Sequence, residues 1–112
     1  MMRGSFGCFC LSLLYILGKN RLSGEVPVNV LTMPQLRFIF LRDNNFHGSL
    51  GGGWESRSVL QELHLGENNF DGTIPDEINK VTTLTALGLD RNMLVGTLPD
   101  VSALTNLSEF EI

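Results

Sequence analysis

Residues 63–75 read LHLGENNFDGTIP, and this stretch decides the fold. Asn68 lies inside an apolar rhythm, with a glycine four residues later and an Ile-Pro pair at the end. The same arrangement recurs at a constant interval of two dozen positions, and the asparagines that mark the copies are Asn20, Asn44, Asn68 and Asn92. A constant period of this length predicts a solenoid, in which each copy forms one coil of a stack.

Other residue types keep fixed distances from these asparagines. A leucine stands three residues before each of them, at Leu17, Leu41, Leu65 and Leu89. A glycine follows four residues after each of them, at Gly24, Gly48, Gly72 and Gly96. The residues six places after them are apolar: Val26, Leu50, Ile74 and Leu98. Four agreeing copies make a chance arrangement very improbable, so these positions are predicted to form the scaffold.

The pattern resembles the plant leucine-rich repeat, LxxLxLxxNxLxGxIPxxLxxL, from about residue 12 to the end of the chain. The resemblance implies an α/β fold, a right-handed solenoid that forms a short arc. A parallel β-sheet lies on its concave face, and loops with short 3-10 or helical turns lie on its convex face. We expect residues 12–112 to hold about four and a half repeats, uncapped at both ends. Each repeat has twenty-four residues, the interval between the asparagines, except the last, which has twenty-three.

Alternation within each repeat places side chains inside or outside. Leu63 and Leu65 are expected to point inward and His64 outward, because successive side chains of a strand face opposite ways. Equivalent strands are expected to stack in parallel at about 4.8 Å. The second repeat departs from the pattern: residues 51–53 are glycines where the proline is expected, and Trp54 fills an apolar place.

The resemblance also implies roles for the recurring polar and small residues. The amide of each asparagine bonds the backbone of its own turn and of the next repeat, which forms a ladder. Such bonds explain a buried position, because a buried polar group is tolerated only when it is hydrogen-bonded. The recurring glycine fits a tight bend without room for a Cβ atom. After Pro75, Asp76 and Glu77 suit the start of a short helical turn.

Composition excludes several classes of function. The chain has 112 residues, 8 basic and 12 acidic, for a formal charge of −4 and no basic run, which argues against nucleic acid as a partner. Cys8 and Cys10 are too close to pair easily with each other, and they lack further ligands for a zinc site. His47 and His64 are expected to lie apart without a nucleophile, so we predict no catalytic residue, no metal and no cofactor.

The amino terminus allows two interpretations. Residues 1–11 form an apolar N-terminal segment that resembles the start of a signal peptide. In it, Arg3 precedes an apolar run that covers residues 6–17. Alternatively, residues 12–18 are simply the first repeat, since Tyr15 and Leu17 occupy strand positions. The apolar run is too short to span a bilayer.

The concave face is the candidate binding surface, because its residues differ between repeats while the scaffold residues recur. The predicted ligand-binding residues are Phe38, Phe40, Arg42, Glu62, His64, Glu67, Asp90, Arg91 and Glu109. Phe38 and Phe40 are predicted to face solvent, next to a half of the face that is rich in glutamate. Exposed apolar clusters often mark contact sites; in an incomplete solenoid they also mark surface that neighbouring repeats or a partner chain would cover.

Asn106-Leu107-Ser108 is an N-glycosylation sequon, and Asn106 is predicted toward the convex side, where a glycan would leave the sheet free. Use of this sequon would indicate passage through the secretory pathway.

The repeat form resembles the ectodomains of plant leucine-rich repeat receptor-like kinases and receptor-like proteins. The resemblance implies a non-catalytic module outside the plasma membrane that binds a protein or peptide ligand, or a co-receptor. Attachment to the membrane and any kinase activity would belong to a parent receptor beyond this chain. The alternatives are a small secreted enzyme inhibitor or decoy, and a truncated product without a stable role.

Overall fold

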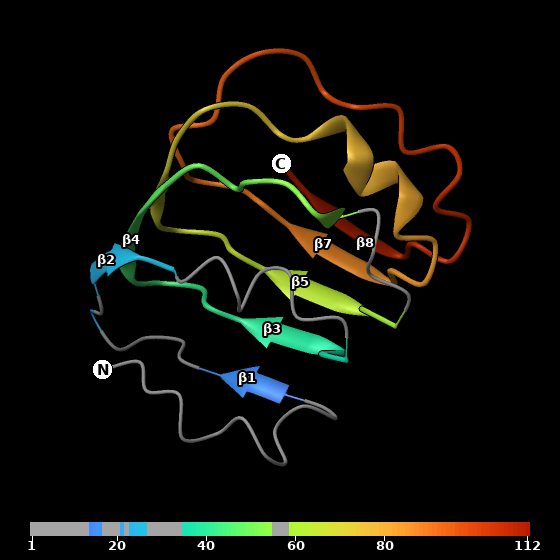
Figure 1. Cartoon of the computed structure of the whole chain (residues 1–112), viewed down its shortest axis with the longest axis horizontal. Helices are drawn as coiled ribbons and strands as arrows, with labels where there is room; N and C mark the ends of the chain where they lie inside the picture. Colours follow the sequence, from blue (N-terminus) through green and yellow to red (C-terminus); the bar gives the residue numbers. More distant parts are fainter. Residues whose placement is uncertain (1–13, 17–20, 22, 27–34, 55–58) are drawn as a thin grey trace.

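The computed structural model describes residues 14–16, 21, 23–26, 35–54 and 59–112. Its first sheet has five strands in the order β1-β3-β5-β7-β8, side by side in Figure 1. Their bounds are Leu14–Ile16 (β1), Phe38–Phe40 (β3), Glu62–His64 (β5), Ala86–Gly88 (β7) and Glu109–Glu111 (β8). Every pairing in this sheet is parallel, which confirms the predicted parallel sheet.

The register of the first sheet reproduces the period of the sequence. Ile39 pairs with Leu63, and Leu63 pairs with Leu87, so partners are separated by the same interval as the asparagines. Leu87 then pairs with Phe110, a step that is one position shorter. This step has the length expected for a last repeat that is shorter by one position.

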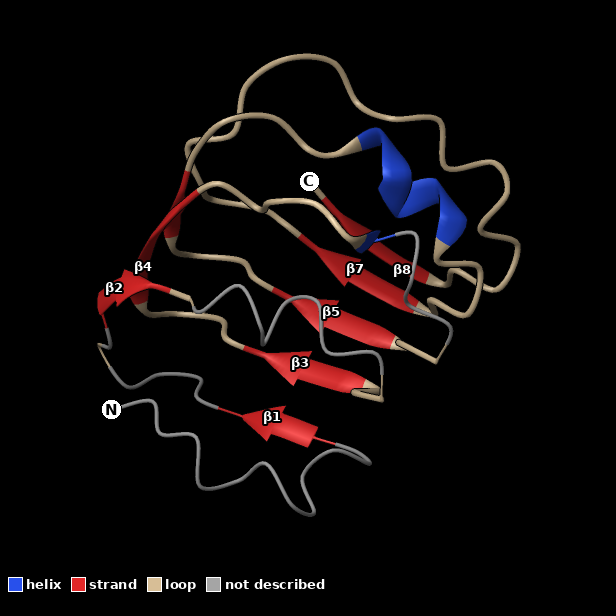
Figure 2. Ribbon diagram, in the orientation of Figure 1, coloured by secondary structure: helices blue, strands red, loops and turns tan. Residues whose placement is uncertain are grey.

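A second sheet was not predicted. It has three parallel strands in the order β2-β4-β6, with bounds Ser23–Glu25, Asn45–Gly48 and Asn69–Phe70. Here the paired residues are two positions closer in sequence than in the first sheet, as in Ser23 with Asn45 and His47 with Asn69. Each described coil from β1 to β6 therefore contributes one strand to the first sheet and the next to the second (Figure 2).

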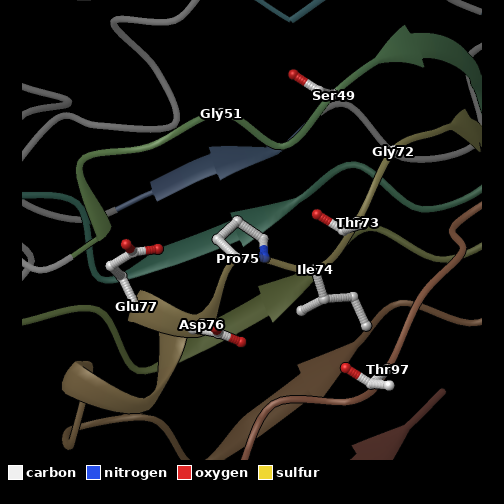
Figure 3. Close-up of a pocket in the computed structure, with 9 residues that line it drawn as sticks. All are labelled: Ser49, Gly51, Gly72, Thr73, Ile74, Pro75, Asp76, Glu77 and Thr97. Carbon is white, nitrogen blue, oxygen red and sulfur yellow. The ribbon is translucent and has the colours of Figure 1, made fainter.

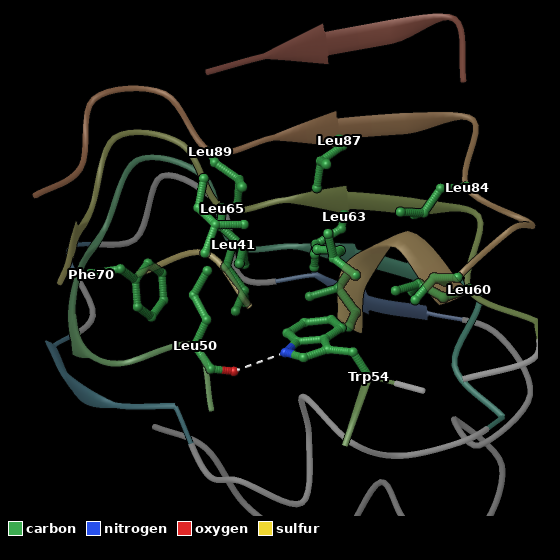
Figure 4. Packing of buried hydrophobic residues seen from close by; sticks show 14 of the residues in the cluster. Leu41, Leu50, Trp54, Leu60, Leu63, Leu65, Phe70, Leu84, Leu87 and Leu89 are labelled. Atoms are coloured by element: carbon green, nitrogen blue, oxygen red, sulfur yellow. Dashed lines mark hydrogen bonds between the residues drawn. The ribbon is translucent and has the colours of Figure 1, made fainter. Parts of the chain in front are cut away.

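The hydrophobic core fills the interior of the coils, and Figure 4 shows its packing. Ile39, Leu63 and Leu87 point inward from adjacent strands and are at most 2% exposed, as predicted. On the convex side Ile78, Val81 and Leu84 are completely buried. Trp54 is buried as well, and its Nε1 donates a hydrogen bond to the carbonyl oxygen of Leu50 at 3.2 Å.

The last coil exposes apolar side chains that the inner coils bury. Leu98 occupies the same repeat position as Leu50, yet it is 55% exposed where Leu50 is 1% exposed. Met93, Val95, Phe110 and Ile112 are exposed as well. In a solenoid each coil is covered by its neighbours, and no further coil lies over this one in the described structure. Leu98 is thus part of the apolar surface that is expected at an uncapped end of the stack.

The asparagine ladder is present, but it connects each coil to the preceding one and not to the next. The Nδ2 group of Asn68 donates to the carbonyl oxygens of Leu65 and Gly66 in its own turn, at 3.2 and 3.1 Å. It also donates to the carbonyl oxygen of Leu41, in the coil before, at 2.9 Å. Its Oδ1 accepts a hydrogen bond from the backbone N–H of Phe46 at 3.1 Å.

The other described asparagines repeat this arrangement. Asn92 donates to Leu65 of the preceding coil at 2.9 Å and accepts from the backbone N–H of Phe70 at 2.9 Å. Asn44 donates to the carbonyl oxygen of Leu41 in its own turn at 3.1 Å. The carbonyl oxygens of Leu41 and Leu65 thus each accept hydrogen bonds from the asparagines of two successive coils. These shared acceptors connect the coils. Asn20 lies outside the described residues.

The reason for the recurring glycine differs from the prediction. Gly24, Gly48, Gly72 and Gly96 all have φ between 76° and 101°, a region that residues with a side chain rarely adopt. Space is not the common cause, since a Cβ atom on Gly24 would meet no atom within 4 Å. The backbone conformation of the bend therefore selects glycine.

The convex segment after Pro75 forms the 3-10 helix η4 (Asp76–Lys80), as predicted. Asp76 and Glu77 lie in its first turn and Lys80 in its last, an order that suits the helix dipole. Among the described residues, no helix has the length and apolar character needed to cross a membrane. The predictions on residues 1–13, including Cys8 and Cys10, lie outside the described part of the chain.

Candidate ligand-binding face

The concave face is the outward surface of the first sheet, and it gathers most of the predicted binding residues. Four strands present two outward residues each, and β7 presents the two smallest ones. These residues are Phe38 and Phe40 on β3, Glu62 and His64 on β5, Ala86 and Gly88 on β7, and Glu109 and Glu111 on β8. The parallel register aligns them in two rows across these strands, one that contains Phe38 and one that contains Phe40.

Three rings from β3 and β5 form a stack on this face. The centroids of Phe38 and Phe40 are 6.2 Å apart with nearly parallel planes, and those of Phe40 and His64 are 4.8 Å apart. His64 also places its Nε2 atom 2.9 Å from Oε1 of Glu62. The rings cover one another, and Phe38 and Phe40 are half-buried. They are therefore less exposed than the prediction that they face solvent implied.

Arg42 forms the centre of a charged cluster on the same face. Its Nη1 and Nη2 atoms donate to the two carboxylate oxygens of Asp90, two coils away, at 2.9 and 3.0 Å. Glu67 lies 3.3 Å from its Nε atom and Glu111 lies 3.6 Å from its Nη1 atom. A bidentate guanidinium–carboxylate pair is among the stronger hydrogen-bonding arrangements in proteins.

Gly66 makes this long bridge possible, because it lies between Arg42 and Asp90 in the same column. A Cβ atom on Gly66 would clash with Nη1 of Arg42 and with Oδ1 of Asp90. The repeat alignment places Arg42, Gly66 and Asp90 in one column, but it contains no sign that the outer two residues meet across the glycine. Arg42 and Asp90, which were both predicted as binding residues, therefore contact each other across Gly66, which was not predicted.

Glu67 and Arg91 are held at the rim of the face by an unusual backbone. They immediately precede Asn68 and Asn92 and have φ of 56° and 57°, and Asp43 has φ of 65° at the equivalent position. The turn into the ladder thus sets the direction of these charged residues. Arg91 is 75% exposed and lies 3.6 Å from Glu67, an ion pair of small energetic weight.

Electrostatics follow from this geometry. The hydrogen bond from Arg42 lowers the pKa of Asp90 below its ordinary value, against the opposing effect of burial. The same bond raises the pKa of Arg42. Because the pKa of Asp90 is lower in the folded state, its contribution to stability is present at neutral pH and is lost as the pH falls through the folded pKa.

The substitution Asp90→Asn tests this ion pair. We expect it to lower the free energy of unfolding by up to about 1 kcal/mol at pH 7, since both groups remain partly exposed to solvent. The difference from the native protein should begin to shrink below about pH 4, where the carboxylate of the unfolded chain protonates, and it should be lost once the pH is below the lowered pKa of the folded state. Urea unfolding at pH 7 and pH 3 measures both values.

Asp71→Asn is the control for this measurement. Asp71 is exposed and has no ion pair among the described residues, so its substitution should change stability little at either pH. A difference between Asp90→Asn and the native protein that stays constant with pH would contradict the assignment.

A groove lies away from the concave face, and sequence reasoning missed it. It has a volume of about 700 Å³ and passes between three coils (Figure 3). Its lining consists of Ser49, Gly51, Gly72, Thr73, Ile74, Pro75, Asp76, Glu77 and Thr97. The repeat alignment treats these positions as bends and convex turns, so no pattern marks them as a hollow. None of the predicted concave residues lines it.

The remaining candidate residues are placed as follows. His47 lies on β4 in the second sheet and His64 on β5 in the first. No group of three or more histidine, cysteine or acidic residues that could hold a metal ion occurs in the described ranges. Asn106 is exposed, and its Nδ2 atom lies 3.5 Å from the carbonyl oxygen of Thr82. Its glycosylation stays a prediction.

Comparisons with known proteins agree with the geometry. The family model of the Leucine Rich Repeat matches residues 59–81. The ectodomain of the receptor kinase SOBIR1 from Arabidopsis thaliana is 28% identical and superimposes on 98% of the chain with a TM-score of 0.87. The chain is a leucine-rich repeat protein of the plant type. This leucine-rich repeat protein is thus similar in structure to plant receptor ectodomains.

Two further structures support the similarity. The plant peptide hormone receptor RGFR1, solved in complex with RGF2, is 27% identical over 89% of this leucine-rich repeat protein, with a TM-score of 0.83. A chain of the BIR3–SERK2 complex from Arabidopsis thaliana is 30% identical over 84%, with a TM-score of 0.76. The leucine-rich repeat protein spans only part of these relatives: 60% of the SOBIR1 chain, 51% of the BIR3–SERK2 chain and 16% of the RGFR1 chain. No curated protein sequence matches it.

Proposed function

We propose that this leucine-rich repeat protein is a non-catalytic ligand-binding module of a plant cell-surface receptor, located on the extracellular side of the plasma membrane. Its partner is a peptide or a co-receptor, and its concave face makes the contact. Similar proteins support the class of partner: RGFR1 was solved with RGF2, and HAESA with the peptide hormone IDA and the co-receptor SERK1.

The observation that carries this proposal is the contrast between the two sides of each first-sheet strand. Inward residues are apolar from coil to coil, as in Ile39, Leu63 and Leu87. Outward residues change from a pair of phenylalanines on β3 to a pair of glutamates on β8. The scaffold does not require half-exposed aromatic rings on this face, and such rings are frequent anchors at interfaces.

The substitution Phe40→Asp tests the proposal. Peptides would first be selected on the native protein from a display library of short random sequences, and the affinities of the selected peptides would then be measured. We expect Phe40→Asp to weaken binding at least about tenfold, because it removes the central ring of the stack.

The matched control is Thr82→Asp, which places the same charge at an exposed position between η4 and β7. This variant should bind the selected peptides like the native protein, and both variants should keep the native circular-dichroism spectrum. Equal affinity of Phe40→Asp and the native protein would remove the concave face as the binding site.

A further inference from the structure

The described part of the concave face has more carboxylates than cationic side chains. Among the described residues, six carboxylates and two guanidinium groups lie at its outward and rim positions: Asp43, Glu62, Glu67, Asp90, Glu109 and Glu111, with Arg42 and Arg91. Arg42 is engaged by Asp90, Glu67 and Glu111, and Arg91 pairs with Glu67. Glu109 has no ion-pair partner among the described residues, and within the same ranges the partner of Glu62 is His64.

The strand between the remaining glutamates carries no projecting side chain. Ala86 and Gly88 of β7 are both buried, and they lie between β5 and β8. Glu62 pairs with Ala86 and Ala86 with Glu109, so these two glutamates stand two strand spacings apart, roughly 10 Å. In the adjacent row, His64 and Glu111 flank Gly88 in the same way.

Together these residues form a trough, defined by the floor Ala86–Gly88 and the walls Glu62, His64, Glu109 and Glu111. Two of the wall side chains reach toward the floor: a Cβ atom on Gly88 would lie 3.7 Å from Oε1 of Glu111 and 3.8 Å from Nδ1 of His64. The imidazole ring of His64 is therefore the aromatic surface of the trough, and the ring of Phe40 stacks on it from the β3 side at 4.8 Å.

Resting on the proposed function, we propose that this trough binds an arginine side chain of the peptide ligand. A guanidinium group is planar, stacks on aromatic rings and donates several hydrogen bonds to carboxylates, and the trough offers both kinds of partner. An acidic ligand would be repelled by the wall carboxylates. An apolar side chain would cover Glu62 and Glu109 without satisfying them, which costs free energy.

A titration with Nα-acetyl-arginine amide tests the inference without an identified ligand. Its neutral analogue, Nα-acetyl-citrulline amide, has nearly the same shape and is the matched probe. We expect the arginine probe to shift the NMR resonances of the His64 and Phe40 rings, with an affinity about tenfold higher than that of the citrulline probe. The affinity should fall as the concentration of NaCl is raised from low to high. Equal shifts with both probes would overturn the inference.

Substitutions in the trough and on the opposite side of the coil localise the effect. Glu62→Gln with Glu109→Gln should abolish the preference for arginine over citrulline, since it removes a charge from both walls while keeping their size. Glu77→Gln, at an exposed position of η4, should retain the preference. A preference that survives the double substitution would place the arginine site elsewhere and overturn the inference.

Selected peptides separate this inference from the proposed function. Peptides from the display library should be enriched in arginine, and replacing that arginine with citrulline should weaken binding about tenfold to the native protein. Peptides that lose affinity with Phe40→Asp but contain no required basic residue would contradict the arginine site. They would still support the concave face as the binding surface. A library that yields no peptide dependent on Phe40 would count against both.

Discussion

The substitution Leu50→Ala is expected to lower the free energy of unfolding by about 2–5 kcal/mol, the largest effect of any change considered. Leu50 is 1% exposed and belongs to the core cluster between the coils. Removing its side chain loses the transfer free energy of the buried groups and leaves a cavity that the stacked coils fill only in part. For a small domain with a total stability of about 5–15 kcal/mol, this is a large fraction.

Leu98→Ala is the matched control, because Leu98 is the same residue type at the same repeat position. Leu98 is 55% exposed, so its truncation should cost no more than about 0.5 kcal/mol. Urea unfolding, followed by circular dichroism, measures both variants. Similar losses for the two leucines would contradict the burial assigned to the inner coils and the exposure assigned to the last coil.

The substitution Asn68→Ala is expected to cost about 1–3 kcal/mol by leaving buried backbone groups without partners. The side chain is 6% exposed, donates to three carbonyl oxygens and accepts from one backbone N–H. Two of these four partners, Leu41 and Phe46, belong to the preceding coil. The loss should therefore loosen the contact between coils as well as the local turn.

Asn69→Ala gives the comparison at the adjacent position. Asn69 is exposed on β6, and no side-chain hydrogen bond of it occurs in the described structure. Its truncation should change stability by less than about 0.5 kcal/mol. If thermal or urea unfolding shows Asn68→Ala to be as stable as Asn69→Ala, the ladder does not stabilise the stack.

The repeated positions of the fold could be predicted because each coil obeys the same local rules. Alternation around Leu63 and Leu65 marks the inward face, and the buried asparagine marks the turn that follows. Four copies of the pattern made these assignments robust. The direction of the ladder could not be predicted, because the period of the sequence is the same when read toward the preceding coil or the next.

The second sheet was missed for a different reason. Its strands are two to four residues long, as in Asn69–Phe70, which is too short for an alternating pattern to stand out in the sequence. They are formed by the bend itself, where glycines with positive φ turn the backbone. A pattern of side chains cannot reveal strands whose cause is backbone geometry.

The candidate site was predicted in part. Alternation places Phe38, Phe40, Glu62 and His64 on one face, but it does not tell that the three rings stack and bury one another. The bridge from Arg42 to Asp90 depends on the empty space above Gly66, which belongs to neither residue and lies in the coil between them. Such contacts depend on three coils at once, so no single repeat encodes them.

The most direct test of the stacked-coil account is hydrogen exchange at two backbone amides, measured by NMR. The amide of Phe46 donates to Asn68, and the amide of Phe70 donates to Asn92 in the next coil. The account predicts that both amides are protected in the native protein and that Asn68→Ala speeds exchange at Phe46 more than at Phe70. Equal acceleration at both amides, or an unprotected Phe46 in the native protein, would contradict it.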